Sequence, residues 1–170
     1  MTKNTKRKMI DSSLKVDNEL AAKNLALAEF PNESWVFING VYVSQTRIKQ
    51  SQKSKNAKDV FEKEMAIAML LVDNGYFVWL LPENRAYVKN PDAIIDGCIY
   101  DFKQVNFKQI EHAFLDALEQ ADNVVLRIVE NKERISRILG KLRKYAKKRE
   151  EGTLILILDT DVRVFEFESI

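Results

Sequence analysis

The fold is decided by the stretch 91–103, which reads Pro-Asp-Ala-Ile-Ile-Asp-Gly-Cys-Ile-Tyr-Asp-Phe-Lys. Two apolar runs flank Asp96-Gly97, and an Asp-Gly pair favours the positive φ values of a tight hairpin turn. We therefore predict two strands, over 93–95 and 98–102. Residues two apart on a strand point to the same face, so Asp101 and Lys103 should project together while Phe102 packs the opposite way.

Around this hairpin, hydrophobic periodicity predicts helices that alternate with strands. One helix precedes it and ends at Asn74-Gly75, which is typical of a helix C-cap. The other predicted helices cover about 107–121 and 133–149, and the other strands cover 76–81, 123–128, 154–158 and 162–167. This order predicts the α/β (α+β) class, with a central mixed β-sheet flanked by helices.

The N-terminal third has a different character. Residues 1 to about 12 are polar, so we expect them to be mobile. Apolar spacing and Pro31 predict a helix over 13–29, and Asn39-Gly40 predicts a hairpin of strands 35–38 and 41–43. Residues 44–58 lack apolar periodicity, so we predict a basic, flexible linker. We thus divide the chain into residues 1–58, with this helix, hairpin and linker, and a domain over 59–170.

Composition excludes several classes of protein. The chain has 170 residues, of which 46% are hydrophobic and 31% charged, as in ordinary globular proteins. It contains no apolar run of the roughly 18 residues that a membrane span needs, and no secretory signal is expected. Cys98 is the only cysteine, which excludes an internal disulfide and a thiolate-rich zinc site. We expect Cys98 to be a small buried hydrophobe.

Cations are unevenly distributed, although the formal net charge is only +2. Residues 44–58 hold five cations and no acid, and residues 141–149 hold six cations and no acid. Either block can follow a phosphate backbone, although a solvated basic face would have the same composition. The candidate nucleic-acid contacts are Arg47, Lys49, Lys53, Lys55, Arg134, Arg137, Lys141, Lys144 and Lys148.

Four residues suit phosphodiester hydrolysis. Asp92 and Asp101 should meet at one edge of the predicted hairpin, with Lys103 beside them. Glu64 lies on the apolar face of its helix, where a buried carboxylate needs a cation such as Lys103 or a metal ion. Carboxylates hold a hard cation, and a lysine steadies developing charge. Each residue also has a structural alternative, namely a salt bridge, a turn or a surface pair.

In this order, Glu64, Pro91-Asp92 and Asp101-Phe102-Lys103 resemble the PD-(D/E)XK nuclease superfamily. More narrowly, residues 59–170 resemble the C-terminal toxin nucleases of contact-dependent growth inhibition systems. The segments that carry this narrower resemblance are 62–66, 74–76, 90–92, 96–97, 119–122 and 124–126. Many relatives have glutamate where this chain has Asp101, and the shorter side chain should change metal preference without removing the ligand.

The resemblance implies a PD-(D/E)XK-like core and a toxin-type ribonuclease that acts on tRNA in the cytoplasm. It implies catalytic roles for Glu64, Asp92, Asp101 and Lys103, with Gln120 near the site. The implied cofactor is a divalent cation, Mg²⁺ or Mn²⁺ with Zn²⁺ as a further option, held by Glu64, Asp92 and Asp101. The implied partners are RNA in preference to DNA and an acidic immunity protein, with no membrane.

Other functions stay open at this point. His112, the only histidine, is a candidate general base for a metal-independent toxin ribonuclease. A DNase is the nearest alternative substrate class. The second alternative is a nuclease-like fold that binds nucleic acid or protein without cutting. The chain is also compatible with a domain of a larger toxin or mobile-element protein.

Overall fold

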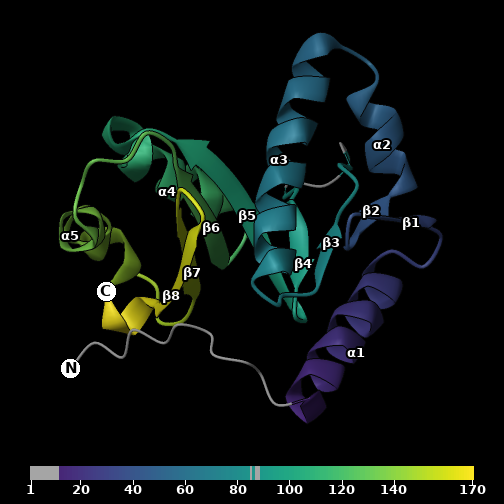
Figure 1. Ribbon diagram of the computed structural model, residues 1–170, viewed down its shortest axis with the longest axis horizontal. Helices are drawn as coiled ribbons and strands as arrows, with labels where there is room; N and C mark the ends of the chain where they lie inside the picture. Colours follow the sequence, from purple (N-terminus) through teal and green to yellow (C-terminus); the bar gives the residue numbers. More distant parts are fainter. Residues whose placement is uncertain (1–11, 85, 87–88) are drawn as a thin grey trace. The chain divides into compact units, whose positions relative to one another are not determined.

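The computed structural model describes residues 12–84, 86 and 89–170 (Figure 1). The predicted mobile segment at residues 1–11 lies outside the described residues. The described chain forms two compact units, which divide between Tyr100 and Asp101. We call residues 12–100 the first unit and residues 101–170 the second unit. The sequence suggests a boundary at 58/59, whereas the observed division at 100/101 falls 42 residues later, within a strand.

The first unit contains three helices and a mainly antiparallel set of strands. Its elements are α1 (Ser12–Glu29), β1 (Trp35–Ile38), β2 (Val41–Ser44), α2 (Gln45–Ser51), α3 (Lys55–Asp73), β3 (Val78–Leu80), β4 (Ala93–Ile95) and the start of β5 (Cys98–Val105). Neighbouring strands follow the order β1-β2-β3-β4-β5. Only β2 and β3 run parallel, because α2 and α3 connect them.

Both predicted hairpin turns are confirmed. Asn39 and Gly40 have φ values of 49° and 84°, and Asp96 and Gly97 have values of 51° and 93°. Gly40 is also required by packing, because a Cβ there would lie 2.6 Å from Cγ1 of Val72 on α3. The turn residues therefore fix the register of both hairpins, and Gly40 additionally lets the first hairpin approach α3 closely.

Strand β3 is buried on both faces. Trp79 packs with Ala22 and Ala26 of α1, whereas Val78 and Leu80 point to the opposite face and are also buried. α3 contacts β3 and contributes Ile67 and Leu71 to the core. On α1 the alanines Ala22 and Ala26 face the strands, while the larger Leu20 and Leu27 are exposed.

The predicted flexible linker over 44–58 is wrong. Its residues form α2 and the first turn of α3, and α2 lies beside α3 (Figure 1). Ser44 caps α2 by accepting a hydrogen bond from the Arg47 amide at 3.0 Å. The carboxylate of Glu33 also accepts hydrogen bonds from the Thr46 amide and hydroxyl, both at 2.9 Å. A distant carboxylate thus stabilises a helix that apolar periodicity does not reveal.

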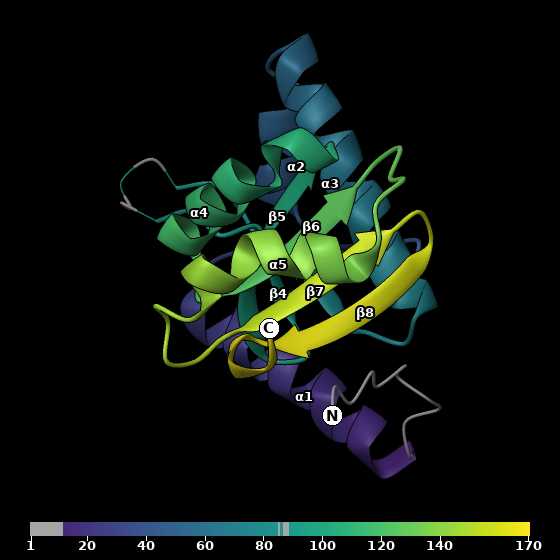
Figure 2. The same ribbon diagram turned by 90° about the vertical axis from the view of Figure 1, so that its left-hand side faces the viewer.

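The second unit has strand order β5-β6-β7-β8. Its other elements are η1 (Phe107–Gln109), α4 (Ile110–Gln120), β6 (Asn123–Ile128), α5 (Ile135–Ala146), β7 (Thr153–Leu158), β8 (Asp161–Glu166) and η2 (Phe167–Ser169). β6 and β7 are parallel, and β7 and β8 are antiparallel. Figure 2 shows α4 and α5 in front of β6 and β7. Phe114 and Leu142 of these helices share a core with Leu126 and Leu156 of the strands.

The predicted mixed α/β fold is confirmed, with eight strands and five α-helices over the described residues. Cys98 corrects one expectation, since it is exposed at the start of β5 and is not a buried hydrophobe. Within the described part of the chain, no helix is both long enough and apolar enough to cross a lipid bilayer.

Candidate functional site

Glu64 is a buried carboxylate on α3. It is only 8% exposed, and it shares its helix face with Ile67, Ala68 and Leu71, as predicted. Its cation partner is Arg47 of α2. The Nε and Nη2 atoms of Arg47 lie 3.1 and 2.5 Å from Oε2 of Glu64. The sequence correctly indicated that this carboxylate needs a cation, but it did not identify which one.

Glu83 shares the same arginine from the outside. Nη1 of Arg47 donates to Oε1 of Glu83 at 2.9 Å, and the Glu83 side chain is 54% exposed. Gln50 of α2 fixes the backbone of Glu83 through two hydrogen bonds. Its Nε2 donates to the Glu83 carbonyl at 2.7 Å, and its Oε1 accepts from the Glu83 amide at 3.1 Å. The chain that follows β3 is therefore held against α2.

Asp92 precedes β4 and interacts electrostatically with Glu64. Its amide donates to the Tyr100 carbonyl at 3.1 Å, and its carbonyl accepts from the Leu81 amide at 2.9 Å. Burial of Glu64 and the negative charge of Asp92 together raise the pKa of Glu64 to about 7, although Arg47 acts in the opposite direction. Arg47 therefore interacts with three carboxylates, of which Glu64 and Glu83 contact it directly and Asp92 acts through its charge.

Asp101 and Lys103 form a second pair, on β5 in the second unit. Nζ of Lys103 lies 2.7 Å from Oδ2 of Asp101, as expected for residues two apart on one strand face. Asp101 is 2% exposed, and the Lys103 side chain is 29% exposed. Phe102 is buried, as predicted. The lysine therefore extends from a buried carboxylate toward solvent.

The predicted catalytic residues thus form one pair in each unit, Glu64 with Asp92 and Asp101 with Lys103. Gln120 is the last residue of α4 and is half-buried. In residues 12–84, 86 and 89–170, no three His, Cys, Asp or Glu side chains are grouped so that they could hold a metal ion. The observed arrangement within the first unit is an anionic pair with a shared arginine.

The first basic block divides into two kinds of residue. Lys49, Lys53 and Lys55 are exposed, so they remain candidates for phosphate contact. Arg47 is 4% exposed and ion-paired, which corrects its assignment as a surface contact for nucleic acid in this structure. Sequence spacing missed this difference because the partners of Arg47 lie 17 and 36 residues away.

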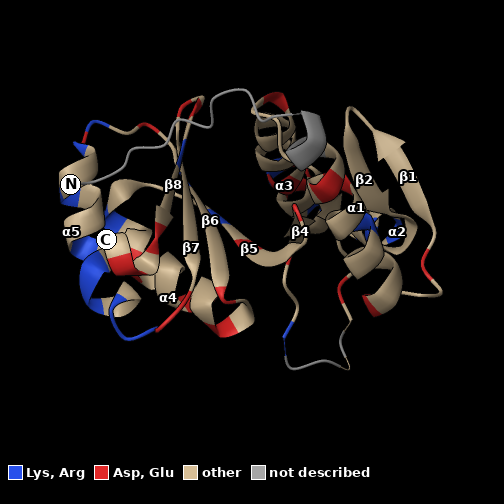
Figure 3. Cartoon of the chain, turned by 90° about the horizontal axis from the view of Figure 1, so that it is seen from below, with Lys and Arg blue, Asp and Glu red and all other residues tan. Residues whose placement is uncertain are grey.

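The second basic block lies on α5, where Figure 3 shows lysines and arginines gathered. The helix spans Ile135–Ala146 and is shorter than the predicted 133–149, so of the candidate contacts Arg134 precedes it and Lys148 follows it. We call Arg134, Arg137, Lys141, Lys144 and Lys148 the α5 stripe. Arg137 and Lys141 lie 5.2 and 4.8 Å from the ring centroid of Phe107. An aromatic side chain with two adjacent cations suits contact with a base and its phosphates.

An acidic side chain partly neutralises this stripe. Glu111 of α4 lies 3.4 Å from Nζ of Lys141 and 3.2 Å from Nζ of Lys144, and it also accepts a hydrogen bond from the Tyr145 hydroxyl at 3.3 Å. The hydrogen bond from Lys144, followed by that from Lys141, lowers the pKa of Glu111. The contact of Glu111 with these lysines could not be predicted from the sequence, because α4 and α5 meet only in the tertiary structure.

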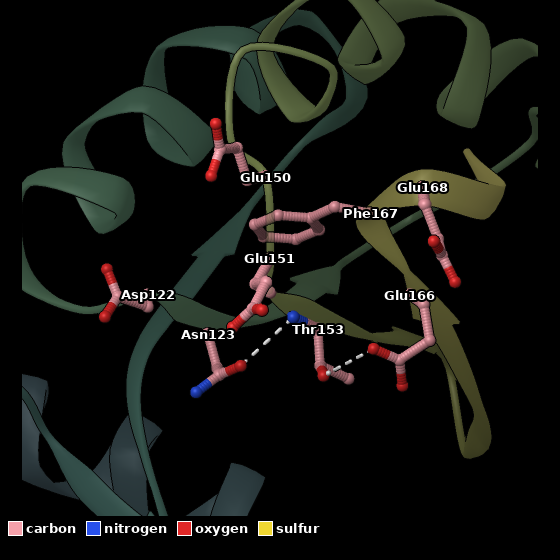
Figure 4. A pocket seen from close by; sticks show the side chains of 9 residues that line it. Asp122, Asn123, Glu150, Glu151, Thr153, Glu166, Phe167 and Glu168 are labelled. Carbon is pink, nitrogen blue, oxygen red and sulfur yellow. Dashed lines mark hydrogen bonds between the residues drawn. The ribbon is translucent and has the colours of Figure 1, made fainter.

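A separate hollow of about 570 Å³ opens in the second unit. Figure 4 shows it rimmed by Asp122, Glu150, Glu151, Glu166 and Glu168, with Phe167 among them. Thr153 donates through its hydroxyl to Glu166 at 3.2 Å and through its amide to Asn123 at 3.0 Å. Five carboxylates repel phosphate, so this hollow is unsuited to a nucleic-acid backbone.

Part of the chain matches a known family, and its fold is similar to that of a solved structure. Residues 89–162 match the family described as the contact-dependent growth inhibition CdiA C-terminal domain, and this segment contains Asp92, Asp101 and Lys103. None of the curated proteins compared with the chain matches it. A chain of the solved CdiA-CT/CdiI toxin and immunity complex from Burkholderia pseudomallei is similar, with a TM-score of 0.53 and 21% identity. The match covers 68% of this chain and 90% of that chain, so the two share a fold.

Proposed function

We propose that this chain is a toxin-type, metal-dependent nuclease that cleaves RNA, with transfer RNA as the expected substrate. The observation that carries the proposal is the buried carboxylate of Glu64, which shares Arg47 with Glu83 and interacts electrostatically with Asp92. The likeness of residues 89–162 to the CdiA C-terminal domain family supports a toxin. Resemblance to PD-(D/E)XK nucleases supports hydrolysis of a phosphodiester bond.

Carboxylate oxygens are the ligands that a hard divalent cation prefers, and we propose Glu64, Asp92 and Asp101 as the residues that would hold it. Mg²⁺ commonly uses one or two protein carboxylates together with substrate phosphates, so a preformed cage of three acids is not required. Mn²⁺ suits the same oxygens, and Zn²⁺ is a further candidate. When bound, such a cation supplies charge that stabilises the phosphate in the transition state and favours ionisation of water.

The remaining residues bind and orient the substrate. We propose Lys103, whose Nζ lies 2.7 Å from Oδ2 of Asp101 and whose side chain is 29% exposed, as a cation that contacts the substrate. Its Nζ can donate to a non-bridging phosphate oxygen, which steadies charge that develops during cleavage. We assign Gln120 a supporting polar contact. The exposed lysines of the first basic block and the α5 stripe would contact phosphates away from the reacting atoms.

A cleavage assay tests this proposal directly. Purified protein is incubated with total RNA and separately with plasmid DNA, in Mg²⁺, Mn²⁺ or Zn²⁺ and then with chelator. We expect discrete fragments from RNA with metal and none with chelator. Asp101→Asn should abolish the cleavage. Cleavage that persists in chelator would support the metal-independent ribonuclease, plasmid cleavage would support the DNase, and no cleavage would support the binding module.

Toxicity provides an independent test. We expect bacteria that express the wild-type chain to stop growing, because cleavage of transfer RNA in the cytoplasm blocks translation. Bacteria that express Asp101→Asn should grow normally. We also propose an acidic immunity protein as the neutralising partner, since complementary charge would accelerate its encounter with the basic surface. Normal growth with abundant soluble wild-type protein would contradict the toxin assignment.

A further inference from the structure

Phe107 is an aromatic side chain held at the surface of the second unit. It begins η1, and Asn106 caps that turn by accepting a hydrogen bond from the Lys108 amide at 3.0 Å. The ring is half-buried and packs against the hydrophobic core of this unit, while its neighbours Asn106 and Lys108 are exposed. Packing therefore restricts the ring, and part of it stays accessible to solvent.

Two cations of α5 lie over this ring. Cζ of Arg137 is 5.2 Å and Nζ of Lys141 is 4.8 Å from the ring centroid. The two residues are one helical turn apart, so both extend from the same face of α5. A cation within about 6 Å of a ring centroid is attracted by the negative face of the ring, which favours positions near Phe107 for both side chains. The helix thus places a guanidinium and an ammonium group beside one aromatic ring.

Glu133 restricts Arg137 further. Nη1 of Arg137 lies 2.7 Å from Oε2 of Glu133, and Asn131 holds the backbone of Glu133 through hydrogen bonds of 3.0 and 3.1 Å. The Arg137 side chain is nevertheless 64% exposed, so a ligand can still reach its planar group. A side chain that is already ordered loses less conformational entropy when a ligand binds.

Acidic side chains offset part of the positive charge around Phe107. Glu133 pairs with Arg137, and Glu111 lies 3.4 Å from Nζ of Lys141. Attraction of phosphates by charge alone is therefore weaker here than the number of cations suggests. The ring of Phe107 and the guanidinium plane of Arg137 remain surfaces on which a nucleobase can stack.

A similar arrangement of cation and ring occurs farther along α5. Nζ of Lys144 lies 4.6 Å from the ring centroid of Tyr145, another half-buried aromatic side chain that packs against the core. Single-stranded nucleic acid is commonly bound by aromatic rings along a positively charged surface. A duplex keeps its bases stacked inside, so it can use only the charges of such a surface. The combination therefore favours unpaired RNA over duplex RNA.

We propose that Phe107, with Arg137 and Lys141, forms a site for an unpaired base of RNA and the phosphate next to it. The base stacks on the surface that Phe107 and the guanidinium of Arg137 form, and Lys141 contacts the phosphate. This inference rests on the proposed RNA substrate and specifies it, because the site selects single-stranded loops over duplex. The contact requires no metal ion, so it can be measured separately from cleavage.

The test is the affinity of the purified whole chain for two 2′-O-methyl RNA probes in chelator, measured by fluorescence anisotropy. One probe is an unstructured single strand, and the other is a duplex with the same number of phosphates. Chelator blocks metal-dependent cleavage, and the methyl groups block attack through the 2′-hydroxyl. Phe107→Leu should weaken binding of the single strand about 5- to 100-fold, the range expected when one base–aromatic stack is lost.

The duplex probe and the salt dependence separate stacking from charge. Phe107→Leu should leave duplex affinity within about twofold of wild type and the salt slope unchanged, because duplex binding depends on charge and leucine removes none. Lys141→Gln should instead weaken binding of both probes and lower the salt slope by about one unit.

Two further variants serve as controls. Phe107→Tyr keeps the aromatic ring and should bind the single strand within about twofold of wild type, a change smaller than the loss of one stack. Phe37→Leu makes the same substitution at a side chain that is 63% exposed on β1 of the first unit, and its affinity should stay within the same range. Circular dichroism establishes that each variant is folded.

Full single-strand affinity in folded Phe107→Leu would overturn the inference, and so would equal losses for the two probes. Equal losses in Phe107→Leu and Phe107→Tyr would also overturn it, since stacking requires only the ring. If any of these results occurs while wild type cleaves RNA, only the inference fails. If the expected pattern is observed but nothing is cleaved, only the nuclease proposal fails. A wild-type chain that neither binds a probe nor cleaves RNA overturns both.

Discussion

Lys103 and Asp101 lie on one face of β5, with Nζ 2.7 Å from Oδ2, but they differ greatly in access to water. Asp101 is 2% exposed, whereas the side chain of Lys103 is 29% exposed. If the ion pair is broken, water can therefore solvate the ammonium group of Lys103 but not the carboxylate of Asp101. This asymmetry gives the two residues different expected effects on stability.

We expect Lys103→Met to destabilise the protein more than Asp101→Asn. Loss of the lysine deprives a buried carboxylate of its nearest cation, which costs about 3 kcal/mol. Loss of the aspartate charge leaves a lysine that can turn to water, at a cost of about 1 kcal/mol. Urea unfolding of both variants measures the difference, and equal costs would contradict the burial argument. Both variants should lose cleavage.

Glu64 should make stability depend on pH. Its pKa in the folded chain is raised from 4.5 to about 7, so the folded state holds the proton more tightly than the unfolded state. This contribution to stability is present below pH 4.5 and is lost as pH rises toward 7. The loss is at most on the order of 3 kcal/mol. Urea unfolding between pH 4.5 and 7.5, in chelator, measures it.

The Glu64→Gln variant should have a flatter pH dependence over that window, because the titrating group is gone. Glu62→Gln is the matched control, since Glu62 is exposed on the same helix and pairs with Lys58. Its profile should parallel that of wild type. Parallel profiles for wild type and Glu64→Gln would show that Glu64 ionises at its ordinary pH in the folded chain.

The basic stripe of α5 should govern substrate capture. Replacement of Lys141, Lys144 and Lys148 by alanine should weaken binding to transfer RNA and lower the salt slope by about one unit for each phosphate that the variant no longer binds. Cleavage at saturating substrate should survive, because these residues touch no reacting atom. Binding titrations at several salt concentrations provide the measurement. If these lysines only face solvent and have no role in binding, wild type and the triple variant should show the same affinity for transfer RNA at every salt concentration.

Glu111 should restrain that stripe. Glu111→Gln removes the carboxylate that lies within 3.4 Å of both Lys141 and Lys144, so transfer RNA should bind more tightly, with a salt slope that is steeper by about one to two units. Glu119→Gln makes the same charge change at an exposed position of α4 and is the control. If both variants gain equally in affinity, net charge and not the Glu111 interaction is responsible.

His112 distinguishes the metal-dependent mechanism from its alternative. Its side chain is 84% exposed, and Nε2 lies 3.4 Å from Asp116 one helical turn later. We expect His112→Gln to cleave RNA at the wild-type rate, because the proposed site does not use this imidazole. A loss of about 100-fold or more, the scale of general base catalysis, would favour the metal-independent ribonuclease.

Local sequence determined most of the secondary structure. Asn39-Gly40 and Asp96-Gly97 fixed both hairpins, because few other residue pairs adopt two successive positive φ values. Hydrophobic periodicity also predicted α4 and α5, whose apolar residues, including Phe114 and Leu142, are buried. Strand alternation placed Asp101 and Lys103 on one face. Each of these features depends on residues that are close in sequence, so the pattern alone is sufficient.

Only the tertiary structure decided the partners of the charged residues. Glu33 stabilises the first turn of α2 from outside the helix by accepting two hydrogen bonds from Thr46, and residues 44–58 alone do not reveal this contact. Arg47 and Lys49 stand two positions apart in one basic block, yet Arg47 pairs with Glu64 in the interior while Lys49 faces water. Glu111 likewise meets Lys144 only because α4 packs against α5. An ion pair between residues 17 or more positions apart leaves no periodic trace in the sequence, because its geometry arises when separate elements pack together.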